Sequence, residues 1–128
     1  MASSASDRAR LVRLGALAMA FGVALGAFGA HGLRDRLTPD LLAVYETGVR
    51  YHLVHGLGLF VAAWLAGEDE TRTARIAGLL LVVGILLFSG SLYLLALTGV
   101  RALGAITPFG GIAWLAAWVL IAMRVKLR

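Results

Sequence analysis

Four long apolar runs follow one another along the chain, and charged or turn-forming residues separate them. A bilayer core about 30 Å thick needs about 20 helical residues, so each run is predicted to form a membrane-spanning helix. The predicted helices cover residues 11–32, 39–66, 73–98 and 105–125, to within a residue or two at each end. The pattern therefore predicts an all-α fold: an integral membrane antiparallel four-helix bundle that forms a single domain over residues 1–128.

The second and fourth predicted helices begin with the same signal. Thr38 precedes Pro39 and Asp40, so a hydroxyl can cap the first turn while the acid interacts favourably with the helix dipole. Thr107 and Pro108 repeat the cap and the proline. The first apolar run is longer than the core of about 7 to 15 residues found in signal peptides, and further apolar runs follow it, so we expect an uncleaved helix.

The second helix is unusual because its purely apolar part, residues 53–66, is too short to cross a bilayer alone. Counting back about 20 residues from Ala66 extends the crossing to Thr47. His52 and His55 then lie inside the membrane, with His55 near the midplane. The polar stretch in the first half of this helix is therefore the chemical centre of the chain.

Composition agrees with a membrane protein, because 60% of the residues are hydrophobic and only 15% are charged. The chain has no cysteine, which excludes disulfides and thiolate metal sites. The net charge of +5 comes from short basic clusters beside the apolar runs rather than from one basic face. We therefore expect no nucleic acid partner.

The basic clusters also predict the orientation, because cytoplasmic segments next to membrane helices are enriched in Lys and Arg. The larger group lies at the two termini and in the second connection: Arg8, Arg10, Arg13, Arg72, Arg75, Arg124, Lys126 and Arg128. The smaller group lies in the first and third connections: Arg34, Arg36 and Arg101. Both termini are predicted to be cytoplasmic.

In this orientation the polar side chains gather in the outward-facing half of the bundle, where they need partners or a water-filled cavity. The residues of this predicted polar pocket, a candidate ligand-binding site, are His31, Glu46, Arg50, Tyr51, His52, His55, Ser89, Ser91 and Tyr93. Glu46 and Arg50 are four residues apart with the acid first, which favours an ion pair along the helix. His52 and His55 lie on a different face of the same helix, beside Gly48.

Three interpretations of the two histidines stay open. They are neutral rings hydrogen-bonded to Ser89, Tyr93 or backbone carbonyls, parts of a proton or ligand pathway, or metal ligands. The metal interpretation is the weakest, since only His31 or Glu46 could complete a three-ligand set. Haem would need a histidine in the third or fourth helix, and a hydrolase built on Ser89 or Ser91 lacks an orienting acid. No metal site, cofactor or catalytic residue is therefore predicted.

Small residues recur at every fourth position of the first helix, a pattern that lets membrane helices approach closely. The predicted helix-packing positions are Ala18, Gly22, Gly26 and Ala30 on the first helix and Gly48 on the second. The stripe on the first helix is suited either to packing within the bundle or to packing against another copy of the chain.

Four segments carry a resemblance to a known family: GAFGAHGL at residues 26–33, YETGVRYHLVHGLGL at 45–59, LFSGSLYLLALTG at 87–99 and ITPFGGIAWLAAW at 106–118. Together they resemble the domain of unknown function 423 family of small bacterial inner-membrane proteins, to which the eukaryotic transmembrane protein 256 group is related. The resemblance implies a multi-pass inner-membrane protein without an established activity, and it supplies no catalytic residues. Glu46 departs from the family pattern, which often has an amide at this position, so the resemblance does not imply that an acid-arginine pair is general.

The expected function is non-enzymatic binding of a small or lipidic ligand, or of a membrane protein partner, in the outward-facing polar pocket. Two alternatives stay open. One is a component of a proton-linked or ion-conducting transporter that uses His55, Ser89 and Tyr93. The other is a structural or assembly subunit that forms a homo-oligomer through its glycine stripe. Membrane lipid is the remaining expected partner.

Overall fold

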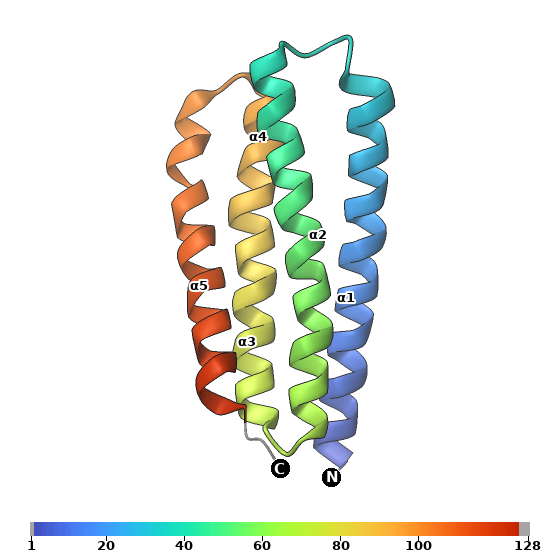
Figure 1. Ribbon diagram of the computed structural model, residues 1–128, viewed down its shortest axis with the longest axis vertical. Coiled ribbons are helices and arrows are strands. Elements are labelled where there is room, and N and C mark those ends of the chain that lie inside the picture. The colour runs from blue at the N-terminus through green and yellow to red at the C-terminus, as the bar shows by residue number, and fades with distance from the viewer. Residues whose placement is uncertain (1, 126–128) are drawn as a thin grey trace.

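The computed structural model describes residues 2–125, in which long helices pack side by side (Figure 1). In chain order the elements are α1 (Ala2–Phe28), η1 (Gly29–Leu33), α2 (Pro39–Gly67), α3 (Thr71–Gly84), η2 (Ile85–Ser89), α4 (Gly90–Thr98), η3 (Arg101–Ala105) and α5 (Thr107–Arg124). Both η1 and η2 are π-helical turns that continue the helices around them, and η3 is a 3-10 turn.

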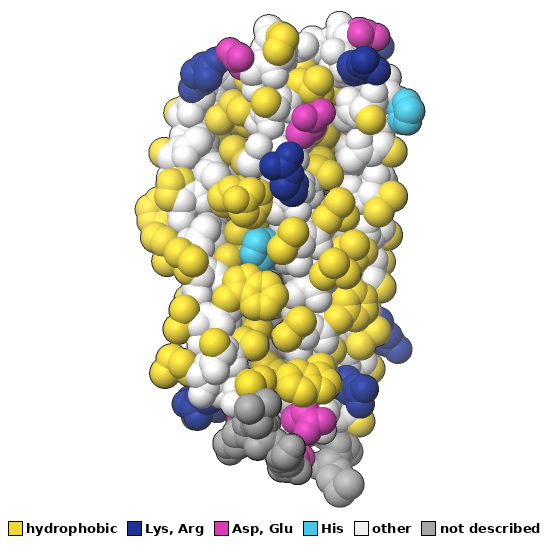
Figure 2. Space-filling view, viewed as in Figure 1, with side chains coloured by type: hydrophobic (Ala, Val, Ile, Leu, Met, Phe, Trp, Pro, Cys, Tyr) yellow, Lys and Arg dark blue, Asp and Glu magenta, His cyan; other side chains and the backbone are white. Residues whose placement is uncertain are grey.

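These elements form 4 continuous spans that are long and apolar enough to cross a membrane: α1 with η1, α2, α3 through α4, and η3 with α5. On the face shown in Figure 2, hydrophobic side chains gather over the middle of the molecule, and most charged side chains lie toward its two ends. The predicted all-α four-helix membrane bundle is confirmed for the described residues.

Successive spans run in opposite directions, so the start of α1 and the end of α5 lie at the same end of the bundle, here called the terminal end (Figure 1). The second span, α2, packs against the first and third spans, while α5 packs on α3 and η2. By contrast, α1 touches α3 only slightly. The first span therefore stands away from the third along much of its length.

The first helix begins at Ala2, well before the predicted start near residue 11. Two contacts at the terminal end explain the difference. Ser4 Oγ donates to the Ala66 carbonyl at 2.9 Å, and Asp7 Oδ2 lies 2.6 Å from an Arg75 guanidinium nitrogen. Because these bonds tie the first turns to α2 and α3, the polar N-terminal residues remain helical.

The two Thr-Pro starts behave differently. Thr38 accepts a hydrogen bond from the Leu41 amide at 3.4 Å, as predicted. Thr107 does not cap α5, so that prediction is wrong. Its hydroxyl is instead bonded to Ser91 Oγ across the bundle at 2.6 Å. Lys126 and Arg128, which entered the predicted charge bias, lie outside the described residues.

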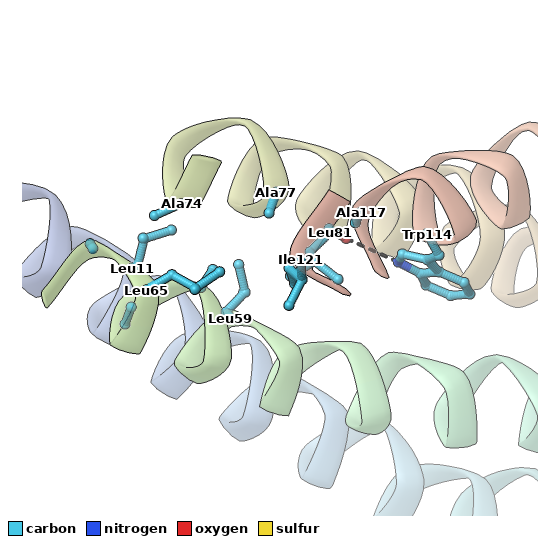
Figure 3. Close-up of a cluster of buried hydrophobic side chains, with 12 residues drawn as sticks. Leu11, Leu59, Leu65, Ala74, Ala77, Leu81, Trp114, Ala117 and Ile121 are labelled. Carbon is cyan, nitrogen blue, oxygen red and sulfur yellow. Dashed lines mark hydrogen bonds between the residues drawn. The ribbon is translucent and has the colours of Figure 1, made fainter. Parts of the chain in front are cut away.

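A hydrophobic core fills the half of the bundle nearer the terminal end (Figure 3). Leu11, Leu59, Leu65, Ala74, Ala77, Leu81, Trp114, Ala117 and Ile121 belong to it. The largest of these side chains, Trp114, is 3% exposed and donates from Nε1 to the Leu81 carbonyl at 3.1 Å. Gly84 makes room for the indole, because a Cβ at that position would overlap it.

The small-residue stripe on the first helix packs against α2 within the chain. A Cβ on Gly22 would lie 2.6 Å from Leu53 Cδ2, and one on Gly26 would lie 3.1 Å from Val49 Cγ1. Ala18 belongs to the partly buried residues that pack on the core, whereas Ala30 is exposed. Most of the stripe is therefore already covered by the chain itself.

On α2, Gly48 allows the third span to approach, since a Cβ there would lie 3.0 Å from the Tyr93 ring. Gly99 follows the last residue of α4 and has a φ of 73°. This left-handed backbone conformation favours glycine, because glycine has no Cβ. Its amide donates to the Leu95 carbonyl at 2.8 Å, and the chain then turns into η3.

Candidate functional site

The structure distributes the nine residues of the predicted polar pocket over several environments instead of one. His31, Glu46 and Arg50 are exposed, and Tyr51 is 42% exposed. The other five lie inside the bundle, fully or partly buried: His52, His55, Ser89, Ser91 and Tyr93. The prediction of one outward-facing polar pocket is therefore corrected. Five of its residues make separate contacts inside the bundle, and the other four are exposed.

Glu46 and Arg50 form no ion pair in the structure, so the expected pairing along α2 is wrong. Both side chains project from the outer face of the bundle. Holding two long exposed side chains in one geometry costs rotamer entropy, which offsets most of the attraction between their charges. His31, on η1, likewise faces away from the bundle interior.

The buried histidine on the side of α1 is His52, which is 5% exposed. Its Nδ1 lies 2.8 Å from the Tyr93 hydroxyl, so the pair joins α2 to α4. A Cβ on Gly22 of α1 would lie 3.4 Å from the imidazole carbon Cδ2. The ring therefore sits where the first, second and third spans meet, close to the middle of α2.

A second tyrosine extends this cluster. The Tyr45 side chain is 1% exposed, and its hydroxyl donates to the Leu25 carbonyl of α1 at 2.5 Å. Its ring centroid lies 5.2 Å from that of Tyr93. The sequence places Tyr45 on the histidine face of α2, but its bond to α1 depends on how two spans pack and has no local signal.

The two serines hold the spans together. Ser89, at the end of the π-helical turn η2, is fully buried and donates to the Gly48 carbonyl at 2.7 Å. Ser91 lies 2.6 Å from the Thr107 hydroxyl, which links α4 to α5. Interhelical hydrogen bonds of this kind stabilise membrane bundles by about 0.6 to 2 kcal/mol each.

The other buried histidine faces α5. The imidazole of His55 stacks on the Trp114 indole with centroids 3.6 Å apart and planes 3° apart. His55 Nδ1 lies 2.7 Å from the Tyr51 carbonyl, while Tyr51 and Phe88 pack around the same indole. Neither Trp114 nor Phe88 was predicted as a site residue, because apolar runs do not show which aromatic residue meets a histidine.

His55, Ser89 and Tyr93 do not form one hydrogen-bonded chain. Each is bonded to a different group: the Tyr51 carbonyl, the Gly48 carbonyl and His52. His52 and His55 are three residues apart and diverge by about 60° around α2. One ring therefore faces α1 and the other faces α5, so the residues of the alternative transport pathway are separated.

A groove of about 340 Å³ lies where α1 stands away from the third span. We call it the α1–α4 groove. Its walls include Leu17 and Phe21 of α1, Leu86 of η2 and Gly90 of α4, and His52 and Tyr93 also line it. Apart from these two side chains and Gly90 the lining is hydrophobic. The groove is therefore an apolar site with one hydrogen-bonded polar pair.

The segment that builds the polar part of this groove matches a known family. Residues 25–111, from the last turn of α1 to the first turn of α5, match the family described as "Protein of unknown function (DUF423)". The chain belongs to the DUF423 family. No solved structure matches this DUF423 protein.

Two relatives of this DUF423 protein are bacterial. UPF0382 membrane protein YwdK of Bacillus subtilis is 50% identical over 109 residues, which cover 84% of this chain and 89% of the relative. UPF0382 membrane protein SH2409 of Staphylococcus haemolyticus is 46% identical over 108 residues, which cover 84% of this chain and 88% of the relative. Both names describe membrane proteins, in agreement with the apolar spans of this DUF423 chain.

Proposed function

We propose that this DUF423 protein is a multi-pass protein of the bacterial inner membrane that binds the hydrocarbon chain of a membrane lipid in the α1–α4 groove. Both termini lie in the cytoplasm in this proposal. The orientation rests on the excess of basic residues at the terminal end, where cytoplasmic Lys and Arg are expected. Those within the described residues are Arg8, Arg10, Arg13, Arg72, Arg75 and Arg124.

The observation that carries the proposal is the groove itself. Its volume of about 340 Å³ falls within the range of about 300 to 1,000 Å³ that is common for ligand pockets. It lies beside the middle of α2 and is lined almost entirely by hydrocarbon side chains, so an apolar chain is the ligand that it can best accommodate. A strongly polar ligand would lose hydration there without gaining partners.

The polar pair at the groove does not conflict with an apolar ligand. His52 Nδ1 and the Tyr93 hydroxyl satisfy each other at 2.8 Å, so neither of these atoms requires a bond from the ligand. The hydrogen bond between His52 and Tyr93 instead fixes α4 against α2, and so holds in place the wall of the groove that faces α1. Transport through this region would require further polar groups along the route, and the surrounding groove lining is hydrophobic.

Filling the groove tests the proposal. Gly90 lines the groove, and a Cβ there would meet its nearest neighbour, the Ile85 carbonyl oxygen, only at 3.9 Å. The substitution Gly90→Phe should therefore occupy the groove without displacing the backbone. We expect the lipid-bound fraction, measured by native mass spectrometry from mild detergent, to fall by about tenfold or more. A tenfold loss of affinity corresponds to about 1.4 kcal/mol of binding free energy.

The matched control is Gly111→Phe on α5. A Cβ at Gly111 also meets its nearest neighbour, Phe88 Cδ2, at 3.9 Å, but Gly111 lies outside the groove. Both variants make the same change of side chain within a helix. Gly111→Phe should retain lipid as the wild type does. Equal retention by wild type and Gly90→Phe, with both proteins folded, would refute lipid binding in the groove.

A further inference from the structure

A second hollow lies between α1 and α3 nearer the terminal end. Its volume is about 330 Å³, and its walls include Asp7, Arg10 and Arg75 together with apolar residues. Leu14 and Val82 line both this hollow and the α1–α4 groove. The two hollows therefore adjoin, and together they are here called the crevice, which is charged at the terminal end and apolar farther along.

The charged part of the crevice, here called the basic mouth, consists of Asp7, Arg10 and Arg75. Asp7 is 4% exposed, and its Oδ2 accepts from Arg75 Nε at 2.7 Å. Arg10 lies close enough to attract the same carboxylate. With one carboxylate and two guanidinium groups, the mouth has an excess positive charge. Arg13 adds a further positive charge in an adjoining hollow, which Arg10 also lines.

The length of the crevice suits a lipid of one leaflet. On α1 the apolar part of its lining runs from Leu14 to Leu25, a rise of about 16 Å at 1.5 Å per residue. Half of a bilayer core of about 30 Å is about 15 Å. A lipid whose headgroup lies at the terminal end would therefore extend its chain to the level of His52 and Tyr93.

We infer that the lipid held in the α1–α4 groove is an anionic phospholipid, whose phosphate lies at the basic mouth beside Arg10 and Arg75. This inference rests on the proposed function, because the groove must first hold a hydrocarbon chain. Guanidinium groups bind phosphate oxygens through charge-assisted hydrogen bonds. Basic pockets between membrane helices on the cytoplasmic side are suited to anionic headgroups for the same reason.

A simpler interpretation is that Arg10 only sets the orientation of the chain. Arginines near helix ends commonly place their charge at the membrane surface for that purpose. The two interpretations differ at Arg124, which ends α5 at the terminal end but does not line the crevice. If only net charge matters, replacing Arg10 or Arg124 should have the same effect on lipid binding. If the mouth binds phosphate, replacing Arg10 should have the larger effect.

The experiment titrates the full chain in mild detergent with phosphatidylglycerol and with phosphatidylcholine of identical chains, and reads the bound fractions by native mass spectrometry. The proteins are the wild type, Arg10→Gln, Arg124→Gln and Gly90→Phe. One arginine beside an anionic lipid contributes about fivefold in affinity. We expect the wild type to prefer phosphatidylglycerol by about fivefold or more, and Arg10→Gln to reduce that preference by about fivefold.

Arg124→Gln should keep the full preference, and Gly90→Phe should lose both lipids. Equal binding of the two lipids by the wild type would overturn the headgroup assignment, as would an equal loss of preference in Arg10→Gln and Arg124→Gln. In those cases loss of both lipids in Gly90→Phe would still support chain binding in the groove. Unchanged binding of both lipids in Gly90→Phe would instead overturn the proposed function itself.

Discussion

Replacing Trp114 by Ala is expected to lower the free energy of unfolding by about 3 to 5 kcal/mol, the range for removing a buried tryptophan side chain. The indole is 3% exposed and donates to the Leu81 carbonyl at 3.1 Å. It also stacks on His55 with centroids 3.6 Å apart. The substitution therefore leaves a cavity, removes a hydrogen bond and uncovers a histidine ring. Unfolding by sodium dodecyl sulfate in mixed micelles measures the change.

Trp64 provides the matched control, because it is 49% exposed on the outer face of α2. Trp64→Ala removes the same side chain without opening an interior cavity, so its effect should stay below about 1 kcal/mol. A loss of stability in Trp64→Ala as large as that in Trp114→Ala would show that tryptophan content, and not the buried stack, stabilises the bundle.

The double substitution Gly22→Leu and Gly26→Leu is expected to lower the free energy of unfolding by about 2 to 6 kcal/mol, since each overpacked site costs about 1 to 3 kcal/mol. Even a Cβ at Gly22 would lie 2.6 Å from Leu53 Cδ2, and one at Gly26 would lie 3.1 Å from Val49 Cγ1. The larger side chains must push α1 away from α2. The same detergent titration, with the mass of the native particle as a second measurement, tests this expectation.

Ala24→Leu with Ala27→Leu is the control, because both alanines lie on the exposed face of α1. This pair adds bulk outside the bundle and should leave the stability within about 1 kcal/mol of the wild type. If Gly22→Leu with Gly26→Leu instead left unfolding unchanged and only reduced the mass of the particle, the stripe would act between copies of the chain. That outcome would favour the assembly alternative over packing within the bundle.

The bundle could be predicted from the sequence because each span is encoded locally. An apolar run of sufficient length forms a helix in a bilayer, since a helix satisfies its backbone hydrogen bonds within the one segment. The errors arose where distant residues decide the local structure. The start of α1 depends on Ser4 and Asp7 meeting Ala66 and Arg75, and Thr107 bonds to Ser91 instead of capping its own helix.

The site was less predictable for the same reason. Helical spacing placed His52 and Tyr45 on a common face of α2, and both are buried beside α1. Spacing could not show that His52 would pair with Tyr93 and His55 would stack on Trp114. Those contacts depend on the rotation of each helix about its axis. The α1–α4 groove depends on the spacing between two spans that are far apart in sequence, so no single segment encodes it.

The most direct test of the central claim is photo-cross-linking by a phospholipid that carries a diazirine near the middle of one chain, followed by peptide mapping. Lipid in the α1–α4 groove predicts labels concentrated at Phe21 and Leu86, which line it, and their loss in Gly90→Phe. Labels spread evenly over exposed residues such as Leu115 and Val119 of α5, and unchanged in Gly90→Phe, would contradict the account.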